Sequence, residues 1–161
     1  MRTVELLLDP GLEREVRSLW SRLHAAGARS LATHTHPTNR PHVTLVVVPS
    51  LEGLPFLGLP VPVSLGAPRM LGRALVLPAT GLHEMHARVW RAVGSANPLH
   101  DPARWVPHVS LALNATPGSD ALLTGLPPLT GEVVAARSYD QETRTVIDLP
   151  DCPAGPVARC L

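Results

Sequence analysis

The chain has 161 residues, a length that fits one compact domain or two small lobes around a shared core. Hydrophobic residues make up 45% of it and charged residues 17%, which excludes an intrinsically disordered protein. Aromatic residues are 3%, too few for single-strand binding by base stacking, and a net charge of +1 provides no global basic field for a long nucleic acid. Any nucleic-acid contact is therefore expected to be local, at an end or a single nucleotide.

The first half of the chain predicts a strand, a helix, a loop and a second strand. Residues 3–8 are rich in Val and Leu and predict a buried strand. Asp9 and Pro10 then form an N-cap and a first helical position, and apolar residues at helical spacing continue until Gly27, a C-capping glycine. A polar loop leads to a clear strand over residues 40–48.

The second half repeats this order. A strand is predicted over residues 73–77, Thr80 and Gly81 open a helix, and Gly94 closes it. A loop then leads to a strand over residues 105–113. Three further strands are predicted over residues 61–65, 131–137 and 144–149.

The repetition predicts an α+β fold in one domain that spans residues 1–161. Two similar lobes, approximately residues 2–65 and 72–137, would each form a mainly antiparallel sheet backed by a helix. A pseudo-twofold axis relates the lobes in this bilobal, duplicated fold and leaves a central groove between them. Because the duplication supplies both halves of a site, a monomer suffices for function.

Both halves carry the same short motif, a strand that opens with Pro-His-Val-(Thr/Ser)-Leu. Alternate side chains of a strand point to opposite faces, so His42 shares a face with Thr44 and His108 shares a face with Ser110. The apolar residues between them face the helices. The two polar pairs are therefore predicted to meet across the groove.

Two histidines with two hydroxyls fit phosphodiester cleavage. In-line displacement at phosphorus needs a base for the attacking water and an acid for the leaving oxygen. An unperturbed imidazole titrates at about pH 6.5 and can serve in either role. The hydroxyls of Thr44 and Ser110 would hold the non-bridging oxygens of the phosphate. This scheme requires no metal and no cofactor.

The two motifs, at residues 42–45 and 108–111, resemble the signature of the 2H phosphoesterase superfamily, H-x-(T/S)-hydrophobic once in each half. The chain is similar over nearly its whole length to the branch of 2′-5′ RNA ligase-like RNA 2′,3′-cyclic phosphodiesterases. It departs from the commoner pattern at Ser110, which keeps the hydroxyl of threonine but lacks the methyl group that stiffens the rotamer.

The resemblance implies that His42 and His108 are catalytic and that Thr44 and Ser110 bind phosphate. It implies a metal-independent hydrolysis of a 2′,3′-cyclic phosphate to a 2′-phosphate, with His108 favoured as the base and His42 as the acid. The reverse reaction would join RNA ends through a 2′-5′ bond. The natural substrate stays open among RNA 2′,3′-cyclic ends, cyclic nucleotides, ADP-ribose cyclic phosphate and 2′-5′ oligonucleotides.

Four further residues are candidates for contact with the substrate. Arg40 and Arg104 each lie a few residues before a motif histidine, a placement that fits phosphate attraction at the groove mouth and a solvated strand entrance equally well. His36 belongs to the loop before the first motif, and Tyr139 lies near the end of a late strand. Ordinary polar surface is the alternative for these two residues.

A metal site is a weaker interpretation of the histidines. His34, His36 and His42 lie close together in the sequence, but their spacing matches no strong zinc pattern. Zinc usually takes four ligands, often with cysteine or a carboxylate among them. We therefore expect no metal at this position.

Two other classes of function compete with the enzyme. One is a non-catalytic protein that binds nucleotides or RNA ends on the same fold, and the other is a structural or partner-binding protein. Because binding alone needs no acid–base pair, the presence of both histidines and both hydroxyls favours the enzyme.

The remaining features predict a cytoplasmic protein. The sequence contains no apolar run of membrane-spanning length and predicts no signal peptide. Cys152 and Cys160 form no short disulfide framework, and reduced thiols are expected. The expected partner is an RNA 2′,3′-cyclic phosphate end or a cyclic nucleotide. No contact with a membrane is expected.

Overall fold

The computed structural model of the protein describes residues 1–152. Within this range it contains eight strands, two α-helices and three short 3-10 helices. The strands are β1 (Arg2–Leu8), β2 (His42–Val48), β3 (Val61–Leu65), β4 (Arg69–Leu71), β5 (Ala74–Thr80), β6 (His108–Ala112), β7 (Leu129–Asp140) and β8 (Thr145–Leu149). The helices are α1 (Pro10–Ala25), α2 (His83–Val93), η1 (Leu31–Thr33), η2 (Pro98–His100) and η3 (Ser119–Leu123).

The helix α1 begins where the sequence predicts, because Asp9 caps it. The Asp9 carboxylate accepts hydrogen bonds from the backbone N–H groups of Leu12, at 2.9 Å, and Glu132, at 2.7 Å. These backbone donors hold the pKa of Asp9 below its usual value. The second bond also ties the start of α1 to β7. The buried stripe of α1 consists of Leu12, Val16, Leu19, Trp20 and Leu23, as the helical spacing predicts.

The strands join into one eight-stranded, antiparallel sheet, which confirms the predicted α+β class. Its path runs β2-β1-β7-β3-β5-β4, with β6 beside β5 and β8 beside β7. The order strand–helix–strand–strand occurs twice along the chain, as β1-α1-β2-β3 and as β5-α2-β6-β7. The last strand of each half pairs with the first strand of the other half, since β3 pairs with β5 and β7 pairs with β1. The two halves are thereby joined at the central β3–β7 pair.

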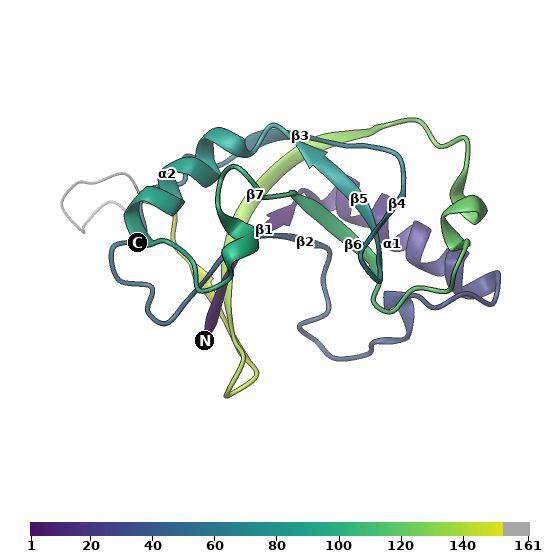
Figure 1. Ribbon diagram of the computed structural model, residues 1–161, viewed down its shortest axis with the longest axis horizontal. Helices are drawn as coiled ribbons and strands as arrows, with labels where there is room; N and C mark the ends of the chain where they lie inside the picture. The colour runs from purple at the N-terminus through teal and green to yellow at the C-terminus, as the bar shows by residue number, and fades with distance from the viewer. Residues whose placement is uncertain (153–161) are drawn as a thin grey trace.

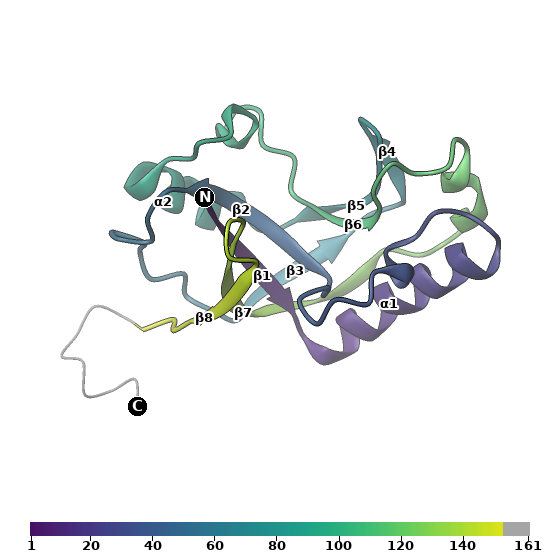
Figure 2. The same cartoon turned by 90° about the horizontal axis from the view of Figure 1, so that it is seen from below.

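The two helices lie at opposite ends of the long axis of the molecule (Figure 1, Figure 2). α1 packs on β7, β1 and β6, and α2 packs on β2. The burial along the motif strands alternates as predicted. In β2 the residues Val43 and Leu45 are fully buried, whereas His42 and Thr44 are half-buried. β6 shows the same alternation, so the apolar face of each strand forms core and the polar face stays accessible.

The start of α2 differs from the prediction. Thr80 is the last residue of β5, where it pairs with Ser64 of β3, and the helix begins only after Leu82. Gly81 forms the turn between them with φ +102°, and a Cβ atom there would lie 2.7 Å from the carbonyl oxygen of Pro62. Strand pairing therefore extends β5 through a residue that the sequence assigned to the helix. Gly94 ends α2 as predicted.

A buried histidine, His86, lies on the inner face of α2. Its exposed fraction is 1%, its ring stacks on that of Trp105 with 3.8 Å between centroids, and its Nε2 has no hydrogen-bond partner in the described residues. Burial, together with the nearby charges of His100 and His83, lowers the pKa of His86 to about 4. The folded protein therefore holds this ring in its neutral form.

Acidification is expected to destabilise the fold through His86. The unfolded chain takes up a proton near the usual pKa of 6.5, whereas the folded state resists protonation down to about 4. As the pH falls through this window, the free energy of unfolding should drop by about 3 kcal/mol. Urea unfolding across the window would measure it. His86→Leu should show a shallower decline than the wild type, and an identical decline in both proteins would contradict the assignment.

Two further observations concern the surroundings of the chain. No helix within residues 1–152 is long and apolar enough to cross a membrane. Cys152 is disulfide-bonded, which contradicts the expectation of a reduced thiol there, and Cys160 lies outside the described residues. Cys152 therefore gives no support to the prediction of a cytoplasmic protein.

Candidate active site

A groove of about 730 Å³ lies against the polar face of the first motif strand. It is lined by His42 of β2, Ser110 of β6 and Tyr139 of β7, and by the loop that precedes β2. The groove thus joins a histidine from one motif with a hydroxyl from the other. The side chains of Thr44 and His108 are half-buried on the same strand faces and lie outside the lining of this groove.

The two motif histidines are held in the same way. The Nδ1–H of His42 donates to the carbonyl of Arg40 at 2.7 Å, and the Nδ1–H of His108 donates to the carbonyl of Val106 at 2.7 Å. Because a carbonyl oxygen only accepts, Nδ1 carries the proton in both rings. Each Nε2 is therefore left for proton exchange with a substrate.

The electrostatic surroundings of His108 favour its neutral form. Burial lowers the pKa of His108 below its usual value of 6.5, and the charges of His42 and Arg69 lower it further. The hydrogen bond from the ring to the Val106 carbonyl raises the pKa, but its effect is smaller than that of burial. The two motif strands, β2 and β6, contact each other, so the two motifs lie near each other.

Two tryptophans form hydrogen bonds to the backbone of the motif strands. The indole N–H of Trp20, on α1, donates to the Ser110 carbonyl at 3.0 Å, and the indole N–H of Trp105 donates to the Thr44 carbonyl at 3.3 Å. Each half of the chain therefore supplies a tryptophan that fixes the backbone of the other half's motif. Trp105 is 6% exposed, so it is a core residue.

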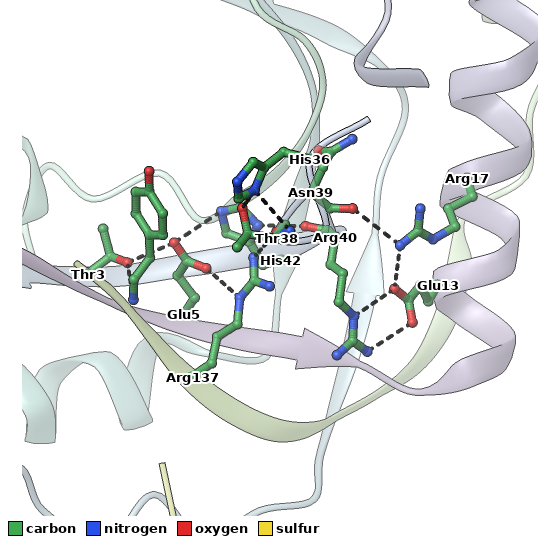
Figure 3. Close-up of polar contacts among 11 residues, drawn as sticks. Thr3, Glu5, Glu13, Arg17, His36, Thr38, Asn39, Arg40, His42 and Arg137 are labelled. Carbon is green, nitrogen blue, oxygen red and sulfur yellow. Dashed lines mark hydrogen bonds and ion pairs between the residues drawn. The ribbon is translucent and has the colours of Figure 1, made fainter. Parts of the chain in front are cut away.

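A buried ion pair supports the first motif, and Figure 3 shows its members converging on His42. The guanidinium of Arg137 donates to Glu5 Oε2 at 2.8 Å, and the hydroxyl of Thr3 donates to Glu5 Oε1 at 2.7 Å. The same Oε1 lies 3.7 Å from Nε2 of His42. Arg137 also donates to the carbonyl of Thr38 at 2.8 Å, which anchors the loop that lines the groove.

Glu5 is a site residue that neither motif predicts. A single carboxylate in the apolar strand Arg2–Leu8 was a usable signal, because a buried charge needs a partner of opposite sign. Glu5 and Arg137 are 4% exposed each, and their side chains face each other across β1 and β7. The pair therefore belongs to the interior face of the site and not to the ordinary surface.

The two motifs have different neighbours on the adjacent strands. Thr44 pairs with Glu5 on β1, whereas Ser110 pairs with the fully buried Val76 on β5, whose other partner is Arg69 on β4. Directly paired residues of antiparallel strands point to the same face. The first histidine therefore has a carboxylate as neighbour, and the second has an apolar side chain and a guanidinium. This difference breaks the symmetry between the two halves.

The predicted substrate contacts divide into two groups. Arg40, His36 and Tyr139 line the groove with His42, whereas Arg104 is exposed and lies outside the lining.

Arg40 already holds an acid partner. Its Nε and Nη2 donate to the two carboxylate oxygens of Glu13 at 3.0 and 3.1 Å (Figure 3), and this bond lowers the pKa of Glu13. The ring of His36 is bonded to the hydroxyl of Thr38 at 2.7 Å.

The described residues hold no group of three or more His, Cys, Asp or Glu side chains arranged to bind a metal ion. His34, His36 and His42 all line the groove, but they do not form such a group.

No protein-family model matches the chain, and no curated protein sequence matches it. Among solved structures, the chain is similar to the crystal structure of the MHV ns2 PDE domain, with a TM-score of 0.56 and 16% sequence identity. The similarity covers 92% of this chain and 97% of that domain. It therefore extends over nearly the whole of both folds, and it confirms the predicted fold class.

Proposed function

We propose that the protein is a phosphodiesterase of the two-histidine type that opens 2′,3′-cyclic phosphates on RNA ends or nucleotides. The observation that carries the proposal is the matched anchoring of His42 and His108. Each ring gives its Nδ1–H to a backbone carbonyl and keeps Nε2 for the substrate, and each has a hydroxyl two residues on. The fold shared with the MHV ns2 PDE domain supports it.

The asymmetric neighbours give the histidines different roles in this proposal. His108 is the base, because burial and two nearby positive groups favour its neutral ring. His42 is the acid, because its Nε2 lies 3.7 Å from the Glu5 carboxylate, within ion-pair distance when the ring is protonated. In this proposal, the residues that differ between the two halves make His108 the base and His42 the acid.

The proposed reaction is an in-line displacement. Nε2 of His108 takes a proton from water as the water oxygen bonds to phosphorus. The bond from phosphorus to the 3′ oxygen breaks on the opposite side, and Nε2 of His42 gives its proton to that oxygen. The hydroxyls of Thr44 and Ser110 donate to the non-bridging oxygens. The products are a 2′-phosphomonoester and a free 3′-hydroxyl. The same displacement with the 5′-hydroxyl of a second RNA end in place of water would form a 2′-5′ bond and free the same 3′-hydroxyl.

The test is hydrolysis of a nucleoside 2′,3′-cyclic phosphate with excess chelator present, followed by identification of the phosphomonoester. We expect the 2′-phosphate, formed at the same rate with and without chelator. A non-catalytic protein that binds nucleotides or RNA ends would bind the cyclic nucleotide without turnover, and that result would replace the proposal by the alternative.

The hydroxyl residues provide a graded prediction. Thr44→Ala and Ser110→Ala are each expected to lower kcat about 100-fold, because each removes one donor to the phosphate in the transition state. Steady-state kinetics on the cyclic nucleotide would measure the loss. Ser21→Ala, at an exposed position of α1, is the matched control and should leave kcat unchanged. Losses below about twofold in both variants would remove the hydroxyls from the mechanism.

A further inference from the structure

The groove continues beyond the candidate active site along the surface. A second hollow, of about 390 Å³, shares His34 and Leu113 with the groove. A third hollow, of about 770 Å³, shares Arg29 with the second and extends to Arg73 and Met70 near the β4–β5 turn. The three hollows therefore adjoin one another in a row that begins at His42 and ends beside β4, and together they are called the depression.

This depression is strongly biased in charge. The chain as a whole is balanced, with 14 Lys and Arg against 13 Asp and Glu. The described residues that line the three hollows include five arginines and a single carboxylate, that of Glu5, which Arg137 already neutralises. Arg40 is paired as well, with Glu13, so the excess charge of the depression comes from the other three arginines, and the composition of the whole chain averages it away. A polyanion is the ligand that such a depression would attract.

The far part of the depression has arginines available for a ligand. Within residues 1–152, the guanidinium groups of Arg29 and Arg73 have no carboxylate partner, and both side chains are exposed. The backbone around them is fixed, because Arg29 N–H donates to the hydroxyl of Thr116 at 3.0 Å and the Arg73 carbonyl accepts from Ala115 N–H at 2.8 Å. The backbone that carries these two charged hydrogen-bond donors is therefore fixed.

The two outer hollows of the depression offer little for the recognition of bases. Trp20, which reaches the groove, is 2% exposed, and its indole N–H is committed to the Ser110 carbonyl. The second and third hollows are lined by no aromatic ring other than that of His34. Contacts would therefore go to phosphates and not to bases, which predicts weak sequence preference and strong salt dependence.

We propose that this depression binds the sugar–phosphate chain of RNA upstream of its 3′ end, with Arg29 and Arg73 contacting phosphates. The inference rests on the proposed function and narrows its substrate class to an oligoribonucleotide that ends in a 2′,3′-cyclic phosphate. A free cyclic nucleotide would fill the groove at His42 and leave the two outer hollows empty.

The kinetic test compares 2′,3′-cyclic UMP with oligouridylates of two, four and eight residues that end in the cyclic phosphate. We expect kcat/KM to rise with length and to fall more steeply with NaCl for the octamer than for the mononucleotide. The Arg29→Ala/Arg73→Ala double variant should reduce the ratio of octamer to mononucleotide kcat/KM about tenfold. Arg22→Ala/Arg91→Ala, which removes the same charge from exposed positions of α1 and α2, should keep the ratio of the wild type.

A binding test separates this inference from the proposed chemistry. Fluorescence anisotropy of a labelled octauridylate that ends in a 2′-phosphate needs no turnover. The Arg29→Ala/Arg73→Ala variant should bind it about tenfold more weakly than the wild type, with a salt slope shallower by about 1.4, or about 0.7 for each lost phosphate contact. Equal affinity in this variant and in the Arg22→Ala/Arg91→Ala control would overturn the inference, whether or not the cyclic nucleotide is hydrolysed.

Discussion

Replacing either motif histidine by alanine is expected to lower kcat by about 100- to 10,000-fold, the usual contribution of a general acid or base. His42→Ala removes the proton donor for the leaving oxygen, and His108→Ala removes the group that takes the proton from water. Both losses should appear in kcat, because the imidazoles act mainly in the transition state. Single-turnover kinetics on a 2′,3′-cyclic nucleotide would measure them.

The two variants are also expected to differ in their pH dependence. His42→Ala keeps the base, whose lowered pKa leaves His108 neutral below its usual titration range, so its residual rate should hold on the acid side of neutrality. His108→Ala has lost that base. His24→Ala, at an exposed position of α1, is the matched control and should retain the wild-type rate. Near-normal turnover in either motif variant would contradict the paired acid–base mechanism.

Glu5→Gln is expected to cost about 3 to 5 kcal/mol of unfolding free energy, because it leaves the guanidinium of Arg137 buried without a countercharge. The two side chains are 6% and 5% exposed and share a bond of 2.8 Å, so water cannot replace the lost partner. A domain of this size has roughly 5–15 kcal/mol of stability in total. Urea unfolding at neutral pH would therefore show a large shift of the midpoint.

Two further variants distinguish a buried ion pair from a general sensitivity to glutamate replacement. Glu84→Gln changes a carboxylate that is 94% exposed and 3.9 Å from its partner, Arg88, and it should cost less than about 1 kcal/mol. Glu5→Gln/Arg137→Met removes both buried charges and should regain part of the lost stability. If Glu5→Gln unfolded no more easily than Glu84→Gln, the buried pair would not support the site as described.

The sequence by itself determined the features that depend on neighbouring residues. The alternation of a strand is local, so the pattern alone placed His42 with Thr44, and His108 with Ser110, on accessible faces. The cap at Asp9 is likewise local, since its carboxylate accepts from Leu12 N–H within the first turn of α1. The repeated order of elements then indicated the α+β fold, because two similar segments need similar packing.

Only the tertiary structure decided the features that join residues distant in the chain. The exchange of β3 and β7 between the halves, and the extension of β5 through Thr80, follow from strand pairing that no local pattern encodes. Glu5 and Arg137 are 132 positions apart, yet they meet beside His42. The row of basic hollows likewise cannot be recognised from a chain whose net charge is +1. Local periodicity fixes which way a side chain points, whereas packing fixes what it meets.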